Sequence, residues 1–389
     1  MSNSYAIIDR LLDDAVARGV AAGLAAIVGD RDAILYEGQA GLRDPGGGAA
    51  MTGDTIFWLA SCTKLVTSIA ALQLVERGLL ALDTPIDDVL PDLAGYRVLA
   101  GIDADGAAVL RVPARPVTLR HLLTHTAGFG YDMMNPELLR ARGAAGPPAS
   151  STIASLRGPL LFDPGEGWAY GNCTDWVGLA VEAVSGQTLD AYFQHEIFAP
   201  LGMHDTGFDA PSDRGAQLCA RGADGGFVAV PSPVADRNAW EYISGGGGLF
   251  GTLPDYLRLL QAVLGGGRSI LGEAMAREIF IIHTGPIRAG ALASVVPEIN
   301  AAFDLFPRMA TGWSLGGMVN PEDVPCGRRA GSLGWAGLAN TYYWADPAAG
   351  RCAVLSAQHL PFAEPAMIDT LRAFERTVYA VPESGYPGS

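Results

Sequence analysis

Ser61 and Lys64 stand three positions apart, at the start of a segment whose apolar residues recur at helical spacing. Residues three apart share one face of a helix, so the lysine amine can reach the serine hydroxyl. A serine is a weak nucleophile at neutral pH and needs a base, and the neutral amine of a lysine can serve as one. The pair therefore predicts nucleophilic catalysis, with the N–H of Ser61, near a helix N-terminus, as a donor to a developing oxyanion.

The tetrad also has a simpler interpretation, because a serine at a helix start is commonly only an N-cap and the S-x-x-K spacing occurs by chance in many chains. Two other segments favour the catalytic interpretation. Tyr170 and Asn172 lie in a loop-like sequence, where a phenol beside a cation can act as a general base and an amide can bind a substrate carbonyl. Residues 334–338 combine small side chains with Leu338, whose backbone N–H can be a second oxyanion donor.

A sheet formed from both chain ends must position these residues. Near the N-terminus the periodicity predicts a helix at 4–18, strands at 23–28 and 33–36, and a helix at 63–77. Helical patterns follow at 119–123, 174–185 and 253–264. Past residue 305 we expect strands at 311–319, 329–333, 341–345 and 352–358, and a helix at 362–380. These patterns predict an α/β domain from residues 1–83 and 241–389, a mainly helical domain from residues 84–240, and an active site between them.

Five motifs in this order resemble the serine β-lactamase and penicillin-binding-protein superfamily, and in particular the class C β-lactamase-like esterases called family VIII carboxylesterases. The motifs are Leu-Ala-Ser-Cys-Thr-Lys at 59–64, Leu-Leu-Thr-His-Thr-Ala-Gly at 122–128, Phe-Asp-Pro-Gly-Glu-Gly-Trp-Ala-Tyr-Gly-Asn at 162–172, Pro-Leu-Gly-Met at 200–203 and Gly-Trp-Ala-Gly at 334–337. The resemblance covers nearly the whole chain, from about residue 5 to residue 380.

The resemblance implies a β-lactamase/transpeptidase-like fold of the α/β (α+β) class, with an antiparallel sheet flanked by helices and a mostly helical inserted domain. It also implies a mechanism in which Ser61 is acylated while Lys64 and Tyr170 handle its proton. The N–H groups of Ser61 and Leu338 would form the oxyanion hole, and water would release the acyl group. Neither a cofactor nor a metal is expected.

One departure separates close relatives within this superfamily. Class C β-lactamases carry Lys-Thr-Gly where this chain has Trp335, Ala336 and Gly337. Loss of that lysine removes a cation that recognises the β-lactam carboxylate, so we expect these three residues to bind uncharged esters. Asn172 keeps the asparagine of the lactamase Tyr-x-Asn motif. Tyr131 resembles an auxiliary tyrosine of such esterases, and both side chains are expected to contact substrate.

A second serine motif competes with Ser61. Residues 312–316 match G-x-S-x-G around Ser314, and Asp346 and His359 follow in the order of an α/β-hydrolase triad. That triad needs a strand-to-helix elbow, but the residues after Ser314 are poor helix formers. Ser314 is therefore expected to be a sheet residue.

Three other features of the sequence are expected to be structural. The histidines show no metal-ligand spacing, and His125 is expected to brace the loop after its helix. The glycine run at 245–248 is expected to be a close-packed turn near the site rather than a phosphate loop. Cys62 is expected to pack in the interior, on a different helical face from Lys64.

Composition limits the classes of partner. Of the 389 residues, 49% are hydrophobic and 17% are charged, and the formal net charge is −15. A protein with this negative charge repels phosphate groups. We therefore expect neither nucleic acid nor a membrane as partner. The five cysteines are odd in number and lack C-x-x-C spacing, which favours a reducing compartment. The N-terminus lacks a basic start followed by an apolar stretch, so a cytoplasmic protein is expected.

The sequence thus predicts a serine carboxylesterase that hydrolyses short-chain or aryl esters and takes a small-molecule ester as its partner. Three alternatives remain. The acyl group could pass from Ser61 to an alcohol or amine, which would make the chain an acyltransferase. It could be a weak β-lactamase or D-amino-acid peptidase. A catalytically inactive binding module is the least expected, because Ser61, Lys64 and Tyr170 are all present.

Overall fold

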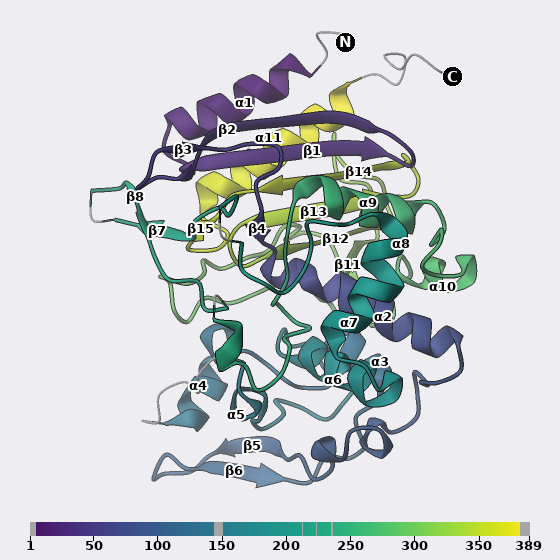
Figure 1. The fold of residues 1–389 in the computed structure, drawn as a ribbon. Helices are drawn as coiled ribbons and strands as arrows, with labels where there is room; N and C mark the ends of the chain where they lie inside the picture. The colour runs from purple at the N-terminus through teal and green to yellow at the C-terminus, as the bar shows by residue number, and fades with distance from the viewer. Residues whose placement is uncertain (1–4, 144–150, 212, 223, 235, 382–389) are drawn as a thin grey trace.

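The computed structural model describes residues 5–143, 151–211, 213–222, 224–234 and 236–381. Its centre is an antiparallel sheet with the strand order β10-β11-β12-β13-β14-β1-β2-β3 (Figure 1). The N-terminal strands are β1 (Gly23–Asp30), β2 (Ile34–Asp44) and β3 (Ala49–Ala50). The C-terminal strands are β10 (Gly312–Trp313), β11 (Met318–Asn320), β12 (Ser332–Gly337), β13 (Thr341–Asp346) and β14 (Arg351–Ser356). Because β1 pairs with β14, the two chain ends meet inside one sheet, as predicted.

Helices cover both faces of this sheet. On one face α1 (Ala6–Ala17) packs against α11 (Pro365–Ala380), from the opposite end of the chain (Figure 1). On the other face lies α9 (Leu253–Leu264), which packs on β1, β13 and β14. Neighbouring residues of a strand point to opposite faces, and β13 shows this: Trp344 contacts Phe374 of α11, whereas Tyr343 contacts Tyr256 of α9.

Most of the remaining helices lie below the sheet in the view of Figure 1, around one central helix. That helix, α2 (Thr63–Glu76), is buried along almost its whole length and packs against α6 (Cys173–Ser185). The shorter helices are α3 (Leu119–Leu123), α4 (Pro136–Arg142), α5 (Ile153–Leu156), α7 (Leu189–Phe193), α8 (Ala199–Leu201) and α10 (Glu273–Glu278). None of the helices within the described ranges has the length and apolar character needed to cross a bilayer.

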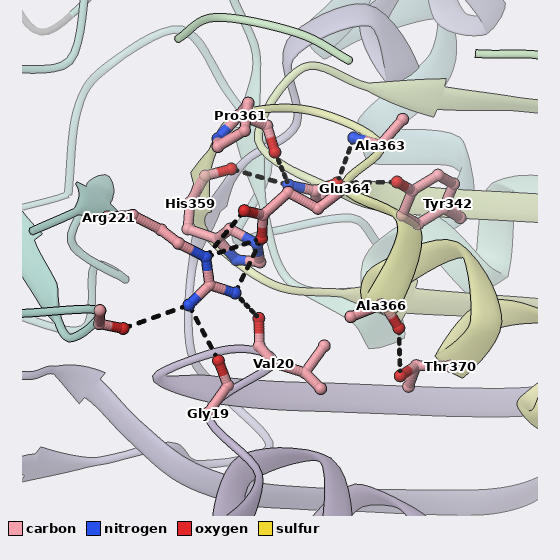
Figure 2. A network of polar contacts seen from close by, with 12 residues as sticks. Gly19, Val20, Arg221, Tyr342, His359, Pro361, Ala363, Glu364, Ala366 and Thr370 are labelled. Carbon is pink, nitrogen blue, oxygen red and sulfur yellow. Dashed lines mark hydrogen bonds and ion pairs between the residues drawn. The ribbon is translucent and has the colours of Figure 1, made fainter. Parts of the chain in front are cut away.

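Within the described residues, three small sheets complete the fold, and one of them, β15-β7-β8, joins the middle of the chain to its C-terminal part. Their strands are β4 (Phe57–Trp58), β5 (Val98–Ile102), β6 (Ala108–Arg111), β7 (Cys219–Arg221), β8 (Phe227–Ala229), β9 (Phe250–Gly251) and β15 (His359–Leu360). β7 pairs with β15, and Arg221 at its end binds Glu364 and donates to the carbonyl of Gly19 (Figure 2). The middle segment is therefore fastened to both termini, and the domain boundaries after residues 83 and 240 remain a prediction.

Three predicted strands differ from the structure. The strand expected at 33–36 continues to Asp44, as β2. The expected strand at 311–319 is two short strands, because the Ser314 hydroxyl accepts hydrogen bonds from the N–H groups of Gly316 and Gly317 and closes a turn. The expected strand at 329–333 lies further along, as β12, and includes residues 334–337. Its glycines lower the strand propensity, but pairing with β11 and β13 on both sides holds this segment in the sheet.

Candidate active site

Ser61 lies in a short 3-10 turn, η1 (Ala60–Cys62), that leads directly into α2. Ala60 has a φ of 45°, in the left-handed region that costs a non-glycine residue about 1–3 kcal/mol. The turn brings Ser61 to the wall of a cavity of about 300 Å³. A strained residue immediately before an accessible serine marks this position as a candidate functional site.

Lys64 is 3% exposed and meets Ser61 as the three-residue spacing predicts. Its Nζ lies 3.0 Å from the Ser61 Oγ, 2.7 Å from the carbonyl oxygen of Gly246 and 3.5 Å from the Tyr131 hydroxyl. A carbonyl oxygen can only accept, so one N–H of the lysine always points at Gly246. When the amine is neutral, its lone pair is then left to accept the Ser61 proton.

Two tyrosines flank the lysine, and they differ in their surroundings. Nζ lies 4.8 Å from the centre of the Tyr170 ring, and the Tyr170 oxygen accepts a hydrogen bond of 2.8 Å from the Trp335 indole N–H. Because an acceptor site of Tyr170 is occupied in this way, its own O–H proton is free to be donated. Burial raises the pKa of Tyr131 well above its usual value, so this side chain stays protonated.

The two expected oxyanion donors lie on the same cavity. Ser61 and Leu338 both line it. Gly337, the last residue of β12, packs directly against the Leu59 carbonyl, and a Cβ at this position would overlap the carbonyl oxygen. This close packing brings Leu338 near Ser61. In the described part of the chain, the Leu338 N–H has no backbone acceptor outside the β12–β13 ladder. It is therefore available to a ligand beside Ser61.

Four of the five expected substrate-binding residues line the cavity. Tyr131, Trp335, Ala336 and Asn172 do so, but Gly337 does not. Asn172 directs its amide hydrogens at the carbonyl oxygens of Ser155 (3.3 Å) and Leu156 (3.0 Å). The expected donation from Asn172 to a substrate carbonyl is thus not offered here, since α5 uses that amide group.

Sequence reasoning missed a buried carboxylate behind the lysine. Asp175 is 3% exposed, and its Oδ1 accepts from the Ser244 hydroxyl (2.7 Å) and the Gly246 N–H (2.9 Å). Burial raises the pKa of Asp175 above its usual value, although the charge of Lys64 and these hydrogen bonds oppose the rise. The only signal in the sequence was an aspartate in the first turn of α6, which is where helices commonly carry acidic residues.

The residues expected to be structural are mostly confirmed as such. The glycine run is a turn at the site, with Gly246 and Gly247 on the cavity wall. His125 is buried, contacts the Tyr170 ring, and accepts at its backbone oxygen from Ala169. Cys62 is fully buried, and burial raises the pKa of its thiol far above the usual value.

The competing triad is not assembled. The Ser314 hydroxyl bonds only within its own turn, to Gly316 and Gly317, among the residues that the structure describes. Asp346 instead accepts from the Tyr379 hydroxyl, and His359 packs on Phe227. Ser314 follows β10 rather than lying within a strand, which corrects the expectation of a sheet residue.

The family model described as Beta-lactamase matches residues 8–377. The chain belongs to the beta-lactamase family. The expected superfamily and fold are therefore confirmed, and this beta-lactamase-family protein is a serine hydrolase.

Its relatives in that family include esterases and acyltransferases. The lovastatin esterase of Penicillium rubens is 35% identical over 350 residues, which are 84% of this chain and 85% of that protein. The monacolin J acid methylbutanoyltransferase of Aspergillus terreus is 35% identical over 347 residues, or 85% and 84% of the two chains. The unliganded structure of simvastatin synthase (LovD) from Aspergillus terreus superposes with a TM-score of 0.83 at 30% identity, covering 99% of this chain and 100% of that one.

Proposed function

We propose that this protein is a carboxylesterase that hydrolyses uncharged short-chain or aryl esters through an acyl-Ser61 intermediate. The contact that carries the proposal is the 3.0 Å distance between the Lys64 Nζ and the Ser61 Oγ, with the lysine oriented by the Gly246 carbonyl. A base held at hydrogen-bond distance from a serine at the cavity wall is the arrangement that nucleophilic catalysis needs.

Each group has one task in the proposed reaction. The Ser61 Oγ bonds to the ester carbonyl carbon while its proton passes to Lys64, and the N–H groups of Ser61 and Leu338 bind the oxyanion. When the tetrahedral intermediate collapses, the C–O bond of the ester breaks and Tyr170 gives its proton to the departing alcohol. Lys64 then returns a proton to Tyr170. Water repeats the sequence on the acyl-enzyme and releases the acid.

The cavity wall supports an uncharged substrate. The apolar residues that line it include Met133, Met134, Leu156, Val234, Leu292 and Phe362. Among the described lining residues the basic side chain is Arg142, which forms an ion pair with Asp132. Trp335 occupies the place where a lactamase cation would recognise a carboxylate. We therefore expect esters to be cleaved faster than β-lactams.

Acyl transfer is a second candidate, and the acyltransferase relatives favour it specifically. The acyl-enzyme would form identically, but an alcohol would then attack it in place of water. Adding increasing concentrations of a short alcohol to the ester reaction and separating the products decides between them. A new ester would show transfer, whereas the free acid alone would show hydrolysis.

The test of the proposed function is Ser61→Ala, measured on p-nitrophenyl butyrate and on nitrocefin. Loss of the nucleophile is expected to lower kcat by at least about 10³-fold on the ester. Ser314→Ala is the matched control, since the other serine motif should leave the rate unchanged. Ester hydrolysis that survives in Ser61→Ala would contradict the proposal, and wild-type turnover that is faster on nitrocefin would move the protein toward the lactamases.

We also propose a cytoplasmic location. All five cysteines are free and four of them are buried, which supports a reducing compartment.

A further inference from the structure

The turn at residues 244–248 presents backbone oxygens to the catalytic helix. Gly245 accepts from the Thr67 hydroxyl (2.6 Å), Gly246 accepts from Lys64 (2.7 Å) and Gly247 accepts from the Trp58 indole (2.7 Å). Three consecutive carbonyl groups thus accept hydrogen bonds from side chains of α2 and of β4, the strand before it. The position of the Lys64 amine depends on where this turn lies.

Asp175 holds the turn from the other side. It accepts from the Ser244 hydroxyl at 2.7 Å and from the Gly246 N–H at 2.9 Å. Gly246 therefore links the two side chains, because its N–H donates to Asp175 and its carbonyl oxygen accepts from Lys64. No arginine, lysine or histidine forms an ion pair with Asp175 anywhere in the part of the chain that the structure describes.

The other groups near the pair are uncharged at neutral pH. Burial raises the pKa of the Tyr131 and Tyr242 hydroxyls, and it raises the pKa of the Cys173 thiol to about 12. The thiol of Cys62 is likewise protonated, and burial lowers the pKa of His125 well below its usual value. The negative charge of Asp175 therefore acts on the Lys64 amine without a competing charge among these neighbours.

We infer that Asp175 is a positioning residue for Lys64, which it orients through the Gly246 peptide and whose ammonium form it stabilises. The inference rests on the proposed function and deepens it. As Ser61 attacks the ester, its proton moves to Lys64 and a positive charge appears on a buried amine. A carboxylate fixed behind that amine lowers the energy of this charge in a low-dielectric site. The step needs no base other than Lys64.

Asp175→Asn tests the inference, because it keeps the size of the side chain and an acceptor for the Gly246 N–H while it removes the charge. Without the carboxylate, the positive charge that forms on the Lys64 amine during the attack loses its nearby counter-charge. We expect kcat on p-nitrophenyl butyrate to fall about 10- to 100-fold with little change in KM. The acid limb of the pH profile of kcat/KM should move to lower pH.

A second variant separates charge from orientation. Ser244→Ala keeps the carboxylate and removes one of its hydrogen bonds, so it should lower kcat a few-fold and leave the acid limb in place. Thermal unfolding of each variant checks that the fold is retained. An acid limb that stays put in Asp175→Asn would overturn the inference, whether or not the rate falls, since a purely structural role leaves the pH profile unmoved.

The rate at which a fluorophosphonate labels Ser61, measured against pH, gives a readout that does not depend on the ester. If wild type is labelled quickly but cleaves no ester, the proposed substrate is wrong and the inference can still be judged from the labelling profile. Slower labelling of Asp175→Asn with a shifted acid limb supports the inference. Equal labelling of the two proteins at every pH contradicts it.

Discussion

Asp175 and Glu375 are both 3% exposed, yet the two carboxylates have different partners. Glu375, on α11, accepts from the Arg328 guanidinium at 2.8 and 2.9 Å and from the Arg328 backbone N–H at 2.9 Å. Burial alone would raise the pKa of Glu375, but the charge and hydrogen bonds of Arg328 outweigh burial and lower it. Asp175, behind the active site, has hydrogen bonds but no cation paired with it, and its pKa is raised.

The contrast separates a charge that maintains the fold from one that serves chemistry. Beneath the sheet, Glu375 forms an ion pair with Arg328, and Arg328 also lies 4.8 Å from the centre of the Trp344 ring. At the site, a carboxylate is left under-compensated, which costs stability but gives the reaction a ready counter-charge. Active sites often retain such unfavourable features because function depends on them.

The largest effect expected from this comparison is on stability. Glu375→Gln leaves Arg328 buried without its counter-ion and should lower the free energy of unfolding by about 3–5 kcal/mol. Asp175→Asn, the same carboxylate-to-amide change at the site, should leave it unchanged or raise it. Urea unfolding of both variants beside wild type measures the difference. Equal losses in the two variants would mean that Asp175 also maintains the fold, and the contrast would fail.

A smaller effect is expected from two indole groups. Trp335→Phe removes the hydrogen bond to Tyr170 at the site, so kcat on p-nitrophenyl butyrate should fall about 3- to 10-fold. Trp344→Phe is the matched change in the sheet, where the indole N–H donates to the Tyr379 hydroxyl at 3.2 Å. It should lower the free energy of unfolding by about 1–2 kcal/mol and leave kcat unaltered. A reversal of these outcomes would show that Trp335 only fills space.

The smallest effect is the pH dependence of stability. Glu375 has a lowered pKa in the folded state, so its contribution is present above the unfolded value of about 4.3 and is lost as the pH falls through the folded value. Asp175 has a raised pKa, so its unfavourable contribution begins to shrink as the pH falls through that higher value and is gone below the unfolded value of about 3.9. Unfolding free energies measured between about pH 3 and pH 7 should show the Glu375→Gln deficit shrinking at the acid end. A deficit that is constant with pH would contradict this assignment.

The sequence was sufficient for the parts of the site that depend on local spacing. Ser61 and Lys64 are brought together by a single helical turn, and the helices at 63–77 and 253–264 were placed within a residue of their observed ends. The pairing of β1 with β14 also followed from the strand-like patterns at the two ends of the chain.

Long-range contacts were beyond such reasoning. Asp175 and Gly246 are 71 positions apart, and neither residue type indicates that it lies beside a lysine of another helix. The glycine run was recognised as a close-packed turn, but the direction of its carbonyl groups depends on how α2, α6 and this turn pack. The hydrogen bonds of Asn172 could not be predicted for a similar reason, because the carbonyl groups of α5 that accept from its amide are positioned by tertiary packing.

The Gly246 turn also determines how the pocket can be altered in the laboratory. One wall is formed by backbone at Gly246 and Gly247, and a Cβ at Gly246 would overlap the Asp175 carboxylate, so this wall tolerates almost no diversification. Other parts of the cavity wall consist of interchangeable apolar side chains such as Met133, Met134 and Leu292. A mutant library aimed at new esters should randomise those side chains and keep the glycines, because new specificities will be found where shape can vary without moving the lysine.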